Sequence, residues 1–418
     1  MSDLPRVLLL TGSPPGEKGV GQIIVGEIYR NYPVDHLFCF AMLNRHESYE
    51  QPTEFSNATI EIARRRFEHQ FRPFGRALEP LTSRISYWLN YRRNCASLTR
   101  DAVAFGKRHQ CDLVFSILEN ASTIEITHAV SQQLGIPKHV LVWDAPDYIG
   151  SKPGSMPLNL SALEQAFGRA MSDADQLAVV SDPMARKYKN DFGLDSVLLR
   201  HVAAPPCHVA ESTDVAKNSE DAPYVIGFAG SVTAKPQLEI LQEALDETDW
   251  FLNGRHVRLD LYGLRFVLQA RCKRNVRYCG YQSVDQTVAS LSESADLLFM
   301  PQPFDSASQS FTELSFPTKL STYLAVGRPI LLLSPANSSL GEFFQQHPFG
   351  VWCKEMDRIR LAESLREISS NQSLANASSE TIRSLIDEQF NHQFFRRQLT
   401  QFLNPTSERS SESLAEAT

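Results

Sequence analysis

The sequence predicts an α/β protein with two doubly wound, Rossmann-like parallel-sheet domains that face a central cleft. Short segments that are apolar throughout alternate with longer amphipathic segments along most of the 418 residues. Strands that are apolar on both faces are typical of a parallel sheet covered by helices on both sides. The chain is too long for one ordinary hydrophobic core. The alternation also stops at residues 203–223 and then starts again, which indicates two domains.

The first domain is predicted to span residues 1–202, with strands at the apolar segments and helices between them. The predicted strands are 6–12, 35–43, 111–118, 138–146 and 176–181. The predicted helices are 21–32, 122–135 and 182–192, the last closed by Gly193. Continuous apolar strands separated by helices make this half one parallel sheet with two covered faces.

Residues 203–223 are polar, contain prolines and hold few large apolar side chains, so they are predicted to link two domains. The second α/β domain is predicted over residues 224–385. A helix over 386–403 is expected to pack back on the N-domain, and the polar tail 404–418 is expected to be disordered. The predicted strands of the second domain are 224–231, 257–263, 275–281, 295–301, 328–334 and 350–354.

The composition excludes several classes of protein. A net charge of −7 argues against wholesale coating of nucleic acid, which needs a basic domain. The seven cysteines show no CxxC pair, as expected of a reduced, cytoplasmic chain. The apolar run near the N-terminus is too short for a signal peptide, and no stretch approaches the roughly 18 apolar residues of a membrane span. We expect a cytoplasmic protein that meets a membrane, if at all, peripherally at its inner face.

Parallel sheets bind ligands outside the carboxyl ends of their strands, so the loops that follow strands are the places to search. In the first domain, the loop after the first strand holds Gly12, Gly16, Gly19 and Gly21. Glycines let the backbone approach a ligand, and the helix that follows points free N–H groups toward it. The spacing is not GxGxxG, so it does not predict a dinucleotide site. A plain flexible turn between strand and helix remains the alternative.

Two lysines in the second domain stand in the first turn of a helix. Lys235 follows the strand that ends at Gly230 and Ser231, and Lys319 opens the segment KLSTYLAVG after a predicted N-cap, Thr318. The helix dipole disfavours a cation at this end unless an anion is bound there. The two lysines therefore predict a clamp for a diphosphate, with solvated lysines as the alternative reading of the same pattern.

From about residue 224 to residue 353, the chain resembles the donor domain of GT-B glycosyltransferases, especially the large retaining glycosyltransferase family 4 (glycosyl transferases group 1). The ordered segments AGS, LDLYG, NVRYCGY, ADLLFMP and FPTKLSTYLAVGRPIL carry the resemblance. It implies transfer of a sugar from a nucleotide-diphosphate-sugar to a glycan, lipid-linked or small-molecule acceptor on the first domain. It also implies which residues bind the donor diphosphate. These are Lys235, Lys319, Ser231, Gly19 and Gly21.

The chain departs from that family at its acidic positions. Thr322 stands where relatives place a glutamate that binds the donor ribose, and Leu314 stands where a second glutamate lies over the sugar. Glu313, one residue earlier, is expected to take this sugar-facing role. Asp144 is the expected carboxylate of the first domain, with Asp147 as a second candidate. An Asx-type turn around Pro146 is the alternative for both aspartates.

These departures keep two other functions open. One is a non-catalytic GT-B relative that binds a nucleotide, glycan or protein partner; the other is a nucleotide-sugar epimerase on the same fold. No metal or other cofactor is expected, because two lysines and helix dipoles can offset the diphosphate charge.

The basic and aromatic segment 63–93 is the remaining unusual feature. Its many arginines, interleaved with aromatic side chains, predict either a helical hairpin with solvated arginines or a peripheral contact with anionic lipid or a polyanionic acceptor.

Overall fold

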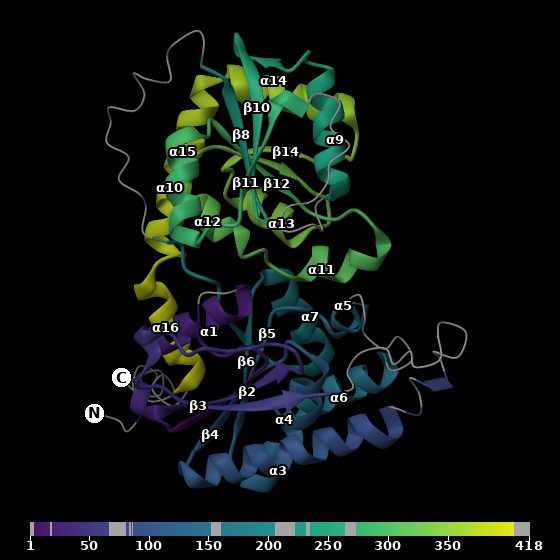
Figure 1. Ribbon diagram of the computed structural model, residues 1–418, viewed down its shortest axis with the longest axis vertical. Coiled ribbons are helices and arrows are strands. Elements are labelled where there is room, and N and C mark those ends of the chain that lie inside the picture. Colours follow the sequence, from purple (N-terminus) through teal and green to yellow (C-terminus); the bar gives the residue numbers. More distant parts are fainter. Residues whose placement is uncertain are drawn as a thin grey trace, which may run out of the picture. The chain divides into compact units, whose positions relative to one another are not determined.

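The protein folds into two compact units, which are shown in the computed structural model of Figure 1. Unit 1 is Met1–Arg200 with Phe395–Thr418, and unit 2 is His201–Phe394. Most of the predicted linker and tail lies outside the described residues. The structure describes residues 4–16, 19–66, 81–82, 85, 87–151, 160–204, 222–230, 235–263 and 273–404.

The sheet of unit 1 has seven parallel strands in the order β3-β2-β1-β4-β5-β6-β7. The strands at its centre are buried along their whole length, as their unbroken apolar sequence predicts. The strands are β1 (Val7–Thr11), β2 (Leu37–Asn44), β3 (Thr59–Arg65), β4 (Leu113–Ile117), β5 (Lys138–Val142), β6 (Gln176–Val179) and β7 (Ser196–Leu198).

Two strands of unit 1, β3 and β7, were not predicted. Both lie at sheet edges, where one side of a strand has no neighbour and the apolar signal is weak. β3 mixes polar and apolar side chains, all of them partly exposed, and it contains Ala63–Arg65. The predicted helical hairpin over 63–93 is therefore wrong at its start. Residues 67–80 of that segment lie outside the described residues.

Helices cover both faces of the unit 1 sheet, and their ends follow local sequence. Asn120 caps one helix in a reciprocal pair with Thr123, and Gly193 closes another in the left-handed conformation, as predicted. The helices are α1 (Val20–Asn31), α3 (Arg92–Arg108), α4 (Ala121–Leu134), α5 (Pro146–Ser151), α6 (Leu160–Ser172), α7 (Asp182–Phe192) and α16 (His392–Leu403), with short turns η1 (Val34–His36), η2 (Thr53–Phe55) and the π-helical η4 (Tyr87–Tyr91).

The last helix, α16, packs on the sheet of unit 1 although it is far from that sheet in sequence. The Phe402 ring lies 5.1 Å from the ring of Phe115 on β4 and 5.4 Å from that of His139 on β5, centroid to centroid. Phe115 and Phe402 are fully buried. The final helix is thus part of the core of unit 1.

The sheet of unit 2 is also parallel, in the order β11-β10-β8-β12-β13-β14, with a two-residue strand, β9, antiparallel to β10. Together with unit 1, it confirms the predicted class of two doubly wound parallel-sheet domains. The strands are β8 (Tyr224–Ala229), β9 (Phe251–Leu252), β10 (Arg255–Tyr262), β11 (Val276–Gly280), β12 (Leu297–Pro301), β13 (Ile330–Leu333) and β14 (Gly350–Cys353).

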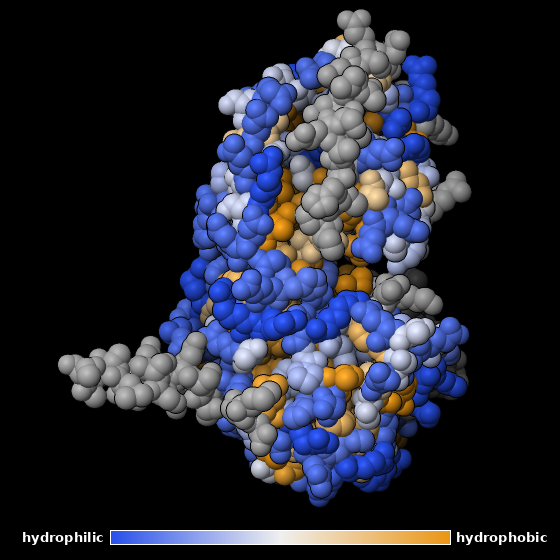
Figure 2. All heavy atoms as spheres, turned by 90° about the vertical axis from the view of Figure 1, so that its left-hand side faces the viewer, coloured by the Kyte–Doolittle hydropathy of each residue, from blue (hydrophilic) through white to orange (hydrophobic). Residues whose placement is uncertain are grey.

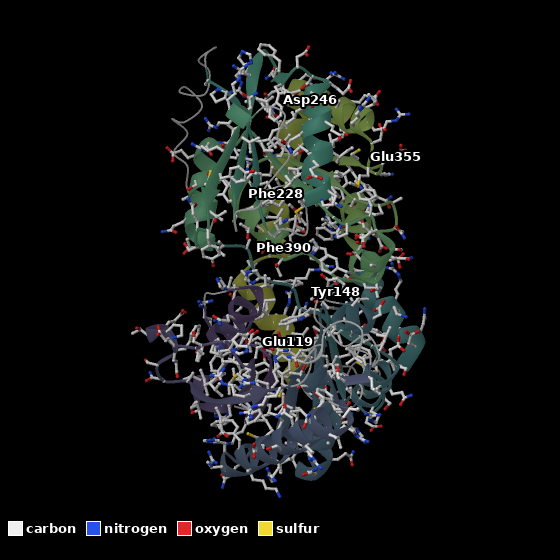
Figure 3. The ribbon with its side chains drawn as sticks, turned by 45° about the vertical axis from the view of Figure 1, so that its right-hand side comes forward. Glu119, Tyr148, Phe228, Asp246, Glu355 and Phe390 are labelled. Atoms are coloured by element: carbon white, nitrogen blue, oxygen red, sulfur yellow. The ribbon has the colours of Figure 1, made fainter. Side chains whose placement is uncertain are left out.

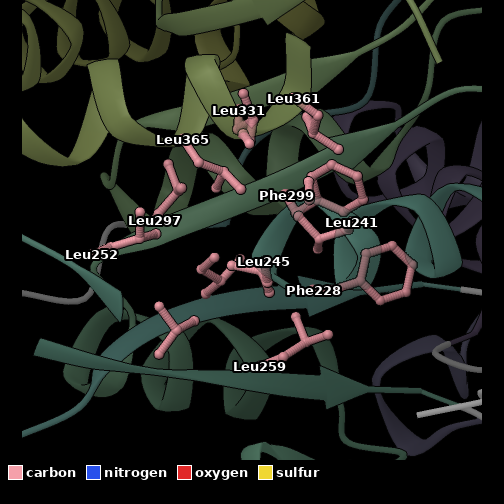
Figure 4. Packing of buried hydrophobic residues seen from close by; sticks show 14 of the residues in the cluster. Phe228, Leu241, Leu245, Leu252, Leu259, Leu297, Phe299, Leu331, Leu361 and Leu365 are labelled. Carbon is pink, nitrogen blue, oxygen red and sulfur yellow. The ribbon is translucent and has the colours of Figure 1, made fainter. Parts of the chain in front are cut away.

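Two apolar clusters hold helices against the two faces of this sheet. One packs Phe228, Leu259 and Phe299 against Leu241 and Leu365 of the covering helices (Figure 4). The other lies on the opposite face and contains Met300, Leu320 and Tyr323. The helices are α9 (Lys235–Asp246), α10 (Val284–Ser294), α11 (Gln309–Leu314), α12 (Lys319–Val326), α13 (Ser339–Gln346), α14 (Arg358–Ser370) and α15 (Gln372–Glu388), with the turns η7 (Lys273–Asn275) and η8 (Ser306–Ser308).

Each sheet reverses its strand order at one place, between β1 and β4 in unit 1 and between β8 and β12 in unit 2. In parallel sheets of this kind, ligands usually bind at such a reversal point, outside the carboxyl ends of the strands. In the described part of the chain, no helix is long and apolar enough to cross a membrane. Hydrophilic residues cover most of the face shown in Figure 2.

Candidate functional site

Lys319 lies over the carboxyl end of β8, at the reversal point of unit 2. It opens helix α12, and its Nζ lies 4.4 Å from the centroid of the Phe228 ring (Figure 3 labels Phe228). A Cβ on Gly230 would lie 2.5 Å from this Nζ and 2.8 Å from Cε. Any larger residue at position 230 would collide with the end of the Lys319 side chain, so the lysine can take this position because residue 230 is glycine.

The ammonium group of Lys319 is buried, although the residue as a whole is half-buried, and the described residues place no anion beside it. Burial lowers its pKa from 10.5 to about 8, and burial is the sole cause, so no carboxylate of the described residues acts on it. The face of Phe228 offsets part of the cost of burying the charge. A buried cation without an anion is unfavourable, and an anionic ligand would remove that cost. The site is therefore suited to a phosphate or diphosphate.

Tyr323 fixes the start of α12 against the sheet. Its hydroxyl accepts a hydrogen bond from the Ala229 N–H (2.9 Å) and donates one to the Phe299 carbonyl (3.0 Å). These two groups belong to β8 and β12, the strands that flank the reversal point. Thr318 is the N-cap residue of α12, as predicted, but its side chain makes no capping hydrogen bond. The predicted closure of this helix by Gly327 is confirmed by its left-handed conformation.

Lys235 differs from Lys319 in having a carboxylate partner. It opens helix α9, which follows β8, and its Nζ lies 3.6 Å from Oε1 of Glu239, one turn later. Both side chains are exposed. Of the two lysines, Lys319 thus fits the predicted diphosphate site better, because no carboxylate of the described residues acts on its ammonium group. Ser231, also predicted to bind the diphosphate, lies outside the described residues.

The Glu313 carboxylate is oriented by two side-chain amides. Its Oε1 accepts hydrogen bonds from Gln309 Nε2 (2.8 Å) and from Asn337 Nδ2 (2.6 Å), the latter in the loop after β13. Leu314 is buried, with 8% of its surface exposed. At this end of α11, the residue with polar neighbours is therefore Glu313. Thr322 is half-buried on α12.

In unit 1, the sequence reasoning missed Glu119, which follows β4 at the reversal point and is labelled in Figure 3. Its Oε1 accepts hydrogen bonds from the Thr11 hydroxyl (2.7 Å) and the Gly12 N–H (2.5 Å), and its Oε2 from the Ser13 hydroxyl (3.4 Å). One carboxylate thus holds the whole start of the glycine-rich loop. An acidic residue directly after an apolar strand was the available signal.

The predicted glycines of this loop lie beside that carboxylate. Gly19 is the residue before α1 and has a φ of 88°, which other residues rarely adopt. A Cβ on Gly21 would lie 2.4 Å from the Ser13 hydroxyl and 3.4 Å from Oε2 of Glu119. Gly21 therefore packs against the part of the loop that Glu119 holds.

Asp144 is half-buried in the loop after β5, and Asp147 lies in the first turn of α5. The buried hydroxyl of Tyr188 is close enough for both carboxylates to act on it. Burial chiefly, and then the charges of Asp147, Asp191 and Asp144, raise the pKa of Tyr188. Within the described ranges, no three histidine, cysteine or acidic side chains gather as they would around a metal ion.

A family model covers the part of the chain that holds this site. Residues 244–399 match the model described as "Glucosyltransferase 3-like, C-terminal domain". No curated protein matches the chain.

Solved structures share the fold over nearly the whole chain. HepE of Anabaena, in complex with UDP and glucose, has a TM-score of 0.65 at 13% identity, covering 96% of this chain and 99% of its own. Sucrose-phosphate synthase from Thermosynechococcus elongatus has a TM-score of 0.66 at 13% identity, covering 99% and 100%. A trehalose-phosphate synthase from Burkholderia xenovorans, in complex with glucose-6-phosphate, has a TM-score of 0.60 at 10% identity, covering 96% and 100%.

These likenesses define the class: the chain has the GT-B fold of nucleotide-sugar-dependent glycosyltransferases. Residues 244–399 are similar to a glucosyltransferase 3-like C-terminal domain. The predicted resemblance to GT-B glycosyltransferases is confirmed, and with it the predicted class of enzyme, a glycosyltransferase.

Proposed function

We propose that the protein transfers a hexose from UDP-hexose to a hydroxyl group of a glycan, a lipid-linked sugar or a small sugar acceptor. The ammonium of Lys319 carries the proposal: it is buried, no carboxylate of the described residues acts on it, and a diphosphate bound there would supply the missing negative charge. HepE and the family model support the choice of donor, since HepE was solved with UDP-glucose.

In this reaction, the bond between the sugar C1 and the diphosphate oxygen breaks, and a bond from C1 to the acceptor oxygen forms. The acceptor proton leaves with the diphosphate or passes to a carboxylate, for which Asp144 is the candidate. Lys319 and the N–H groups at the start of α12 stabilise the charge that develops on the leaving diphosphate. Lys235, Gly19 and Gly21 remain candidates for further diphosphate contacts, Glu313 for the sugar and Thr322 for the ribose. These groups supply the stabilisation from the chain itself, so we propose a metal-independent transfer.

The test is nucleotide binding by the intact chain and by Lys319→Ala. Thermal shift and calorimetry with UDP, GDP and ADP, and with their hexose conjugates, will identify the donor. We expect UDP and UDP-glucose to stabilise the protein, and Lys319→Ala to weaken both at least tenfold, as expected for a charge-assisted hydrogen bond.

Lys354→Ala is the matched control. Lys354 also places its Nζ 4.4 Å from an aromatic ring, that of Trp352, but it is exposed after β14. It should leave the affinity unchanged. Binding of no nucleotide by the intact chain would contradict the donor proposal and favour a relative that binds other ligands. Binding of UDP-glucose without transfer or hydrolysis would favour a non-catalytic nucleotide binder.

For the acceptor, we propose the carboxyl edge of unit 1, next to Glu119 and Asn120. Carboxylate and amide groups are suited to sugar hydroxyls, and the Asn120 Nδ2 is buried there without a hydrogen-bond partner in the described part of the chain. Its Oδ1 is already used to cap α4, so Nδ2 is the atom left to donate.

We also propose a peripheral contact with anionic membrane at the inner face through residues just before α3 and the first residues of α3. Leu81, Ile85 and Leu89 recur every four residues and are about half exposed, and Arg92 and Arg93 follow them. Apolar and basic groups together favour an anionic bilayer surface. The test is co-sedimentation with vesicles of phosphatidylglycerol and phosphatidylcholine. The double variant Leu81→Ser, Leu89→Ser should bind the vesicles more weakly. Vesicle binding that does not change with salt concentration would contradict an electrostatic contribution from the arginines.

A further inference from the structure

Gln302 lies at the reversal point of unit 2, directly after β12. Its N–H donates a hydrogen bond to the Leu333 carbonyl (2.8 Å), so the backbone continues the register of β12 beside β13 for one more residue. Side chains alternate along a strand, and Met300 belongs to the cluster that contains Leu320 and Tyr323 of α12. Gln302 is therefore on the α12 face, the face from which Lys319 comes.

The carboxamide of Gln302 is buried without partners. The side chain is 2% exposed, and neither Oε1 nor Nε2 makes a hydrogen bond within the described residues. Buried polar groups are nearly always paired, and an unpaired one costs free energy because it has lost its water. Because both Nε2 and Oε1 of this amide lack partners among the described residues, the position favours a ligand group that can both donate and accept a hydrogen bond.

The strand order places this amide between two groups of the donor site. β8 ends under Lys319, Gln302 directly follows β12, and the loop after β13 carries Asn337, which donates a hydrogen bond to Glu313. Neighbouring strands lie about 4.8 Å apart, so the carboxyl ends of β8, β12 and β13 follow one another along the edge of the sheet. A ligand with its diphosphate on Lys319 and its sugar toward Glu313 passes over Gln302.

We propose that Gln302 recognises a hydroxyl of the transferred hexose in the donor. A hydroxyl donates to Oε1 or accepts from Nε2, whereas a diphosphate only accepts and would leave Oε1 unpaired. This inference rests on the proposed donor site, and it adds a residue that selects for the sugar rather than for the nucleotide.

The experiment replaces the amide by an apolar side chain of the same length, Gln302→Met, in the full chain. The unliganded variant should melt a few degrees higher, because an unpaired buried amide is removed. Its affinity for UDP-glucose should fall about tenfold, while its affinity for UDP should stay unchanged. Calorimetry with UDP and with UDP-glucose gives both values.

Gln242→Met is the matched control. Gln242 is also a buried glutamine with an unpaired Oε1, but it lies within α9, where its Nε2 donates to the Leu238 carbonyl. Its replacement should change neither affinity. If Gln302→Met does not fold, Gln302→Asn keeps the amide but withdraws it by one methylene. That variant should still lose affinity for UDP-glucose and keep it for UDP.

Each other result overturns the inference. If the affinities for UDP and UDP-glucose fell equally, the amide would contact the nucleotide and not the sugar. Unchanged affinities with a lower melting temperature would show that the amide holds a structural water. If the intact protein binds UDP and UDP-glucose and the variants match it, the inference fails and the donor proposal stands. If the intact protein binds neither, both fail.

Discussion

At the scale of single residues, the site depends on how one lysine is buried. Lys319 is held over the Phe228 ring beside a glycine, and its pKa is lowered to about 8 by burial. A lysine with this pKa is partly neutral just above physiological pH. A moderate rise in pH therefore removes its charge, and with it the attraction for an anion, at pH values where an ordinary lysine stays protonated.

We predict that the affinity for UDP falls as the pH rises from 7 to 9.5. Lys319 is protonated below its pKa of about 8 and neutral above it, so the favourable charge is present at pH 7 and lost through this range. Lys319→Arg stays charged throughout and should flatten the dependence. Calorimetry at several pH values measures this. An equally steep loss in the arginine variant would assign the titration to another group.

We predict that Gly230→Ala weakens UDP binding by about tenfold or more. The added Cβ would meet Nζ and Cε of Lys319 below 3 Å, so the lysine must leave its place over Phe228. Gly168→Ala on α6 is the control, because a Cβ there meets nothing within 4 Å. It should leave binding intact. A normal dissociation constant for Gly230→Ala would show that the lysine binds the ligand from another position.

At the scale of elements, α16 joins unit 1 through a buried histidine. His139 on β5 is 3% exposed and packs on Phe402, and burial lowers its pKa from 6.5 to about 4. The imidazole is therefore neutral in the folded protein at pH values where the unfolded chain would already be protonated. Docking of the last helix is thus coupled to pH.

We predict that unfolding becomes easier as the pH falls from 6.5 to 4. Between pH 6.5 and 4, His139 binds a proton in the unfolded state but not in the folded state. The contribution of the buried, neutral imidazole to the free energy of unfolding is therefore fully present above pH 6.5 and is lost as the pH falls toward 4. The loss is on the order of 3 kcal/mol. Urea unfolding at pH 7.5, 6 and 5 measures it. His139→Phe should reduce the slope, and an unchanged slope would assign it to other groups.

At the scale of the whole molecule, two units of the same class carry different side chains at the same topological place. The reversal point of unit 2 has Lys319 and Gln302, and that of unit 1 has Glu119 and Asn120. A cation suits an anionic donor, and a carboxylate with an amide suits a neutral sugar. Under the proposed function, the two units would therefore bind two chemically different ligands.

We predict that Glu119→Gln raises the KM for the acceptor several-fold and lowers the affinity for UDP by a smaller factor. The variant keeps the shape of the side chain but weakens the bonds that hold Thr11, Gly12 and Ser13 in place. Initial rates with varied acceptor, together with calorimetry for UDP, separate the two effects. Equal loss of UDP affinity would instead assign the glycine-rich loop to the donor.

The sequence by itself determined the fold class and most of its elements. Unbroken apolar segments such as Val7–Thr11 and Ile330–Leu333 have one stable place, a parallel sheet buried on both faces. The sequence also indicated Lys319, since a cation in the first turn of a helix conflicts with the helix dipole. It did not predict β3, because this partly exposed edge strand has no continuous apolar sequence. It also did not predict the salt bridge between Lys235 and Glu239.

Tertiary structure alone decided what surrounds each polar side chain. Nothing local to Gln302 or Glu119 shows that the carboxamide of Gln302 makes no hydrogen bond within the described residues. Nor does it show that the carboxylate of Glu119 binds three groups of a loop more than a hundred residues away. Burial and hydrogen bonding depend on segments that are distant in sequence and meet at the carboxyl edge of a sheet. Periodicity reports which face of an element is buried, whereas the partners of a polar atom are set only when the strands and helices pack.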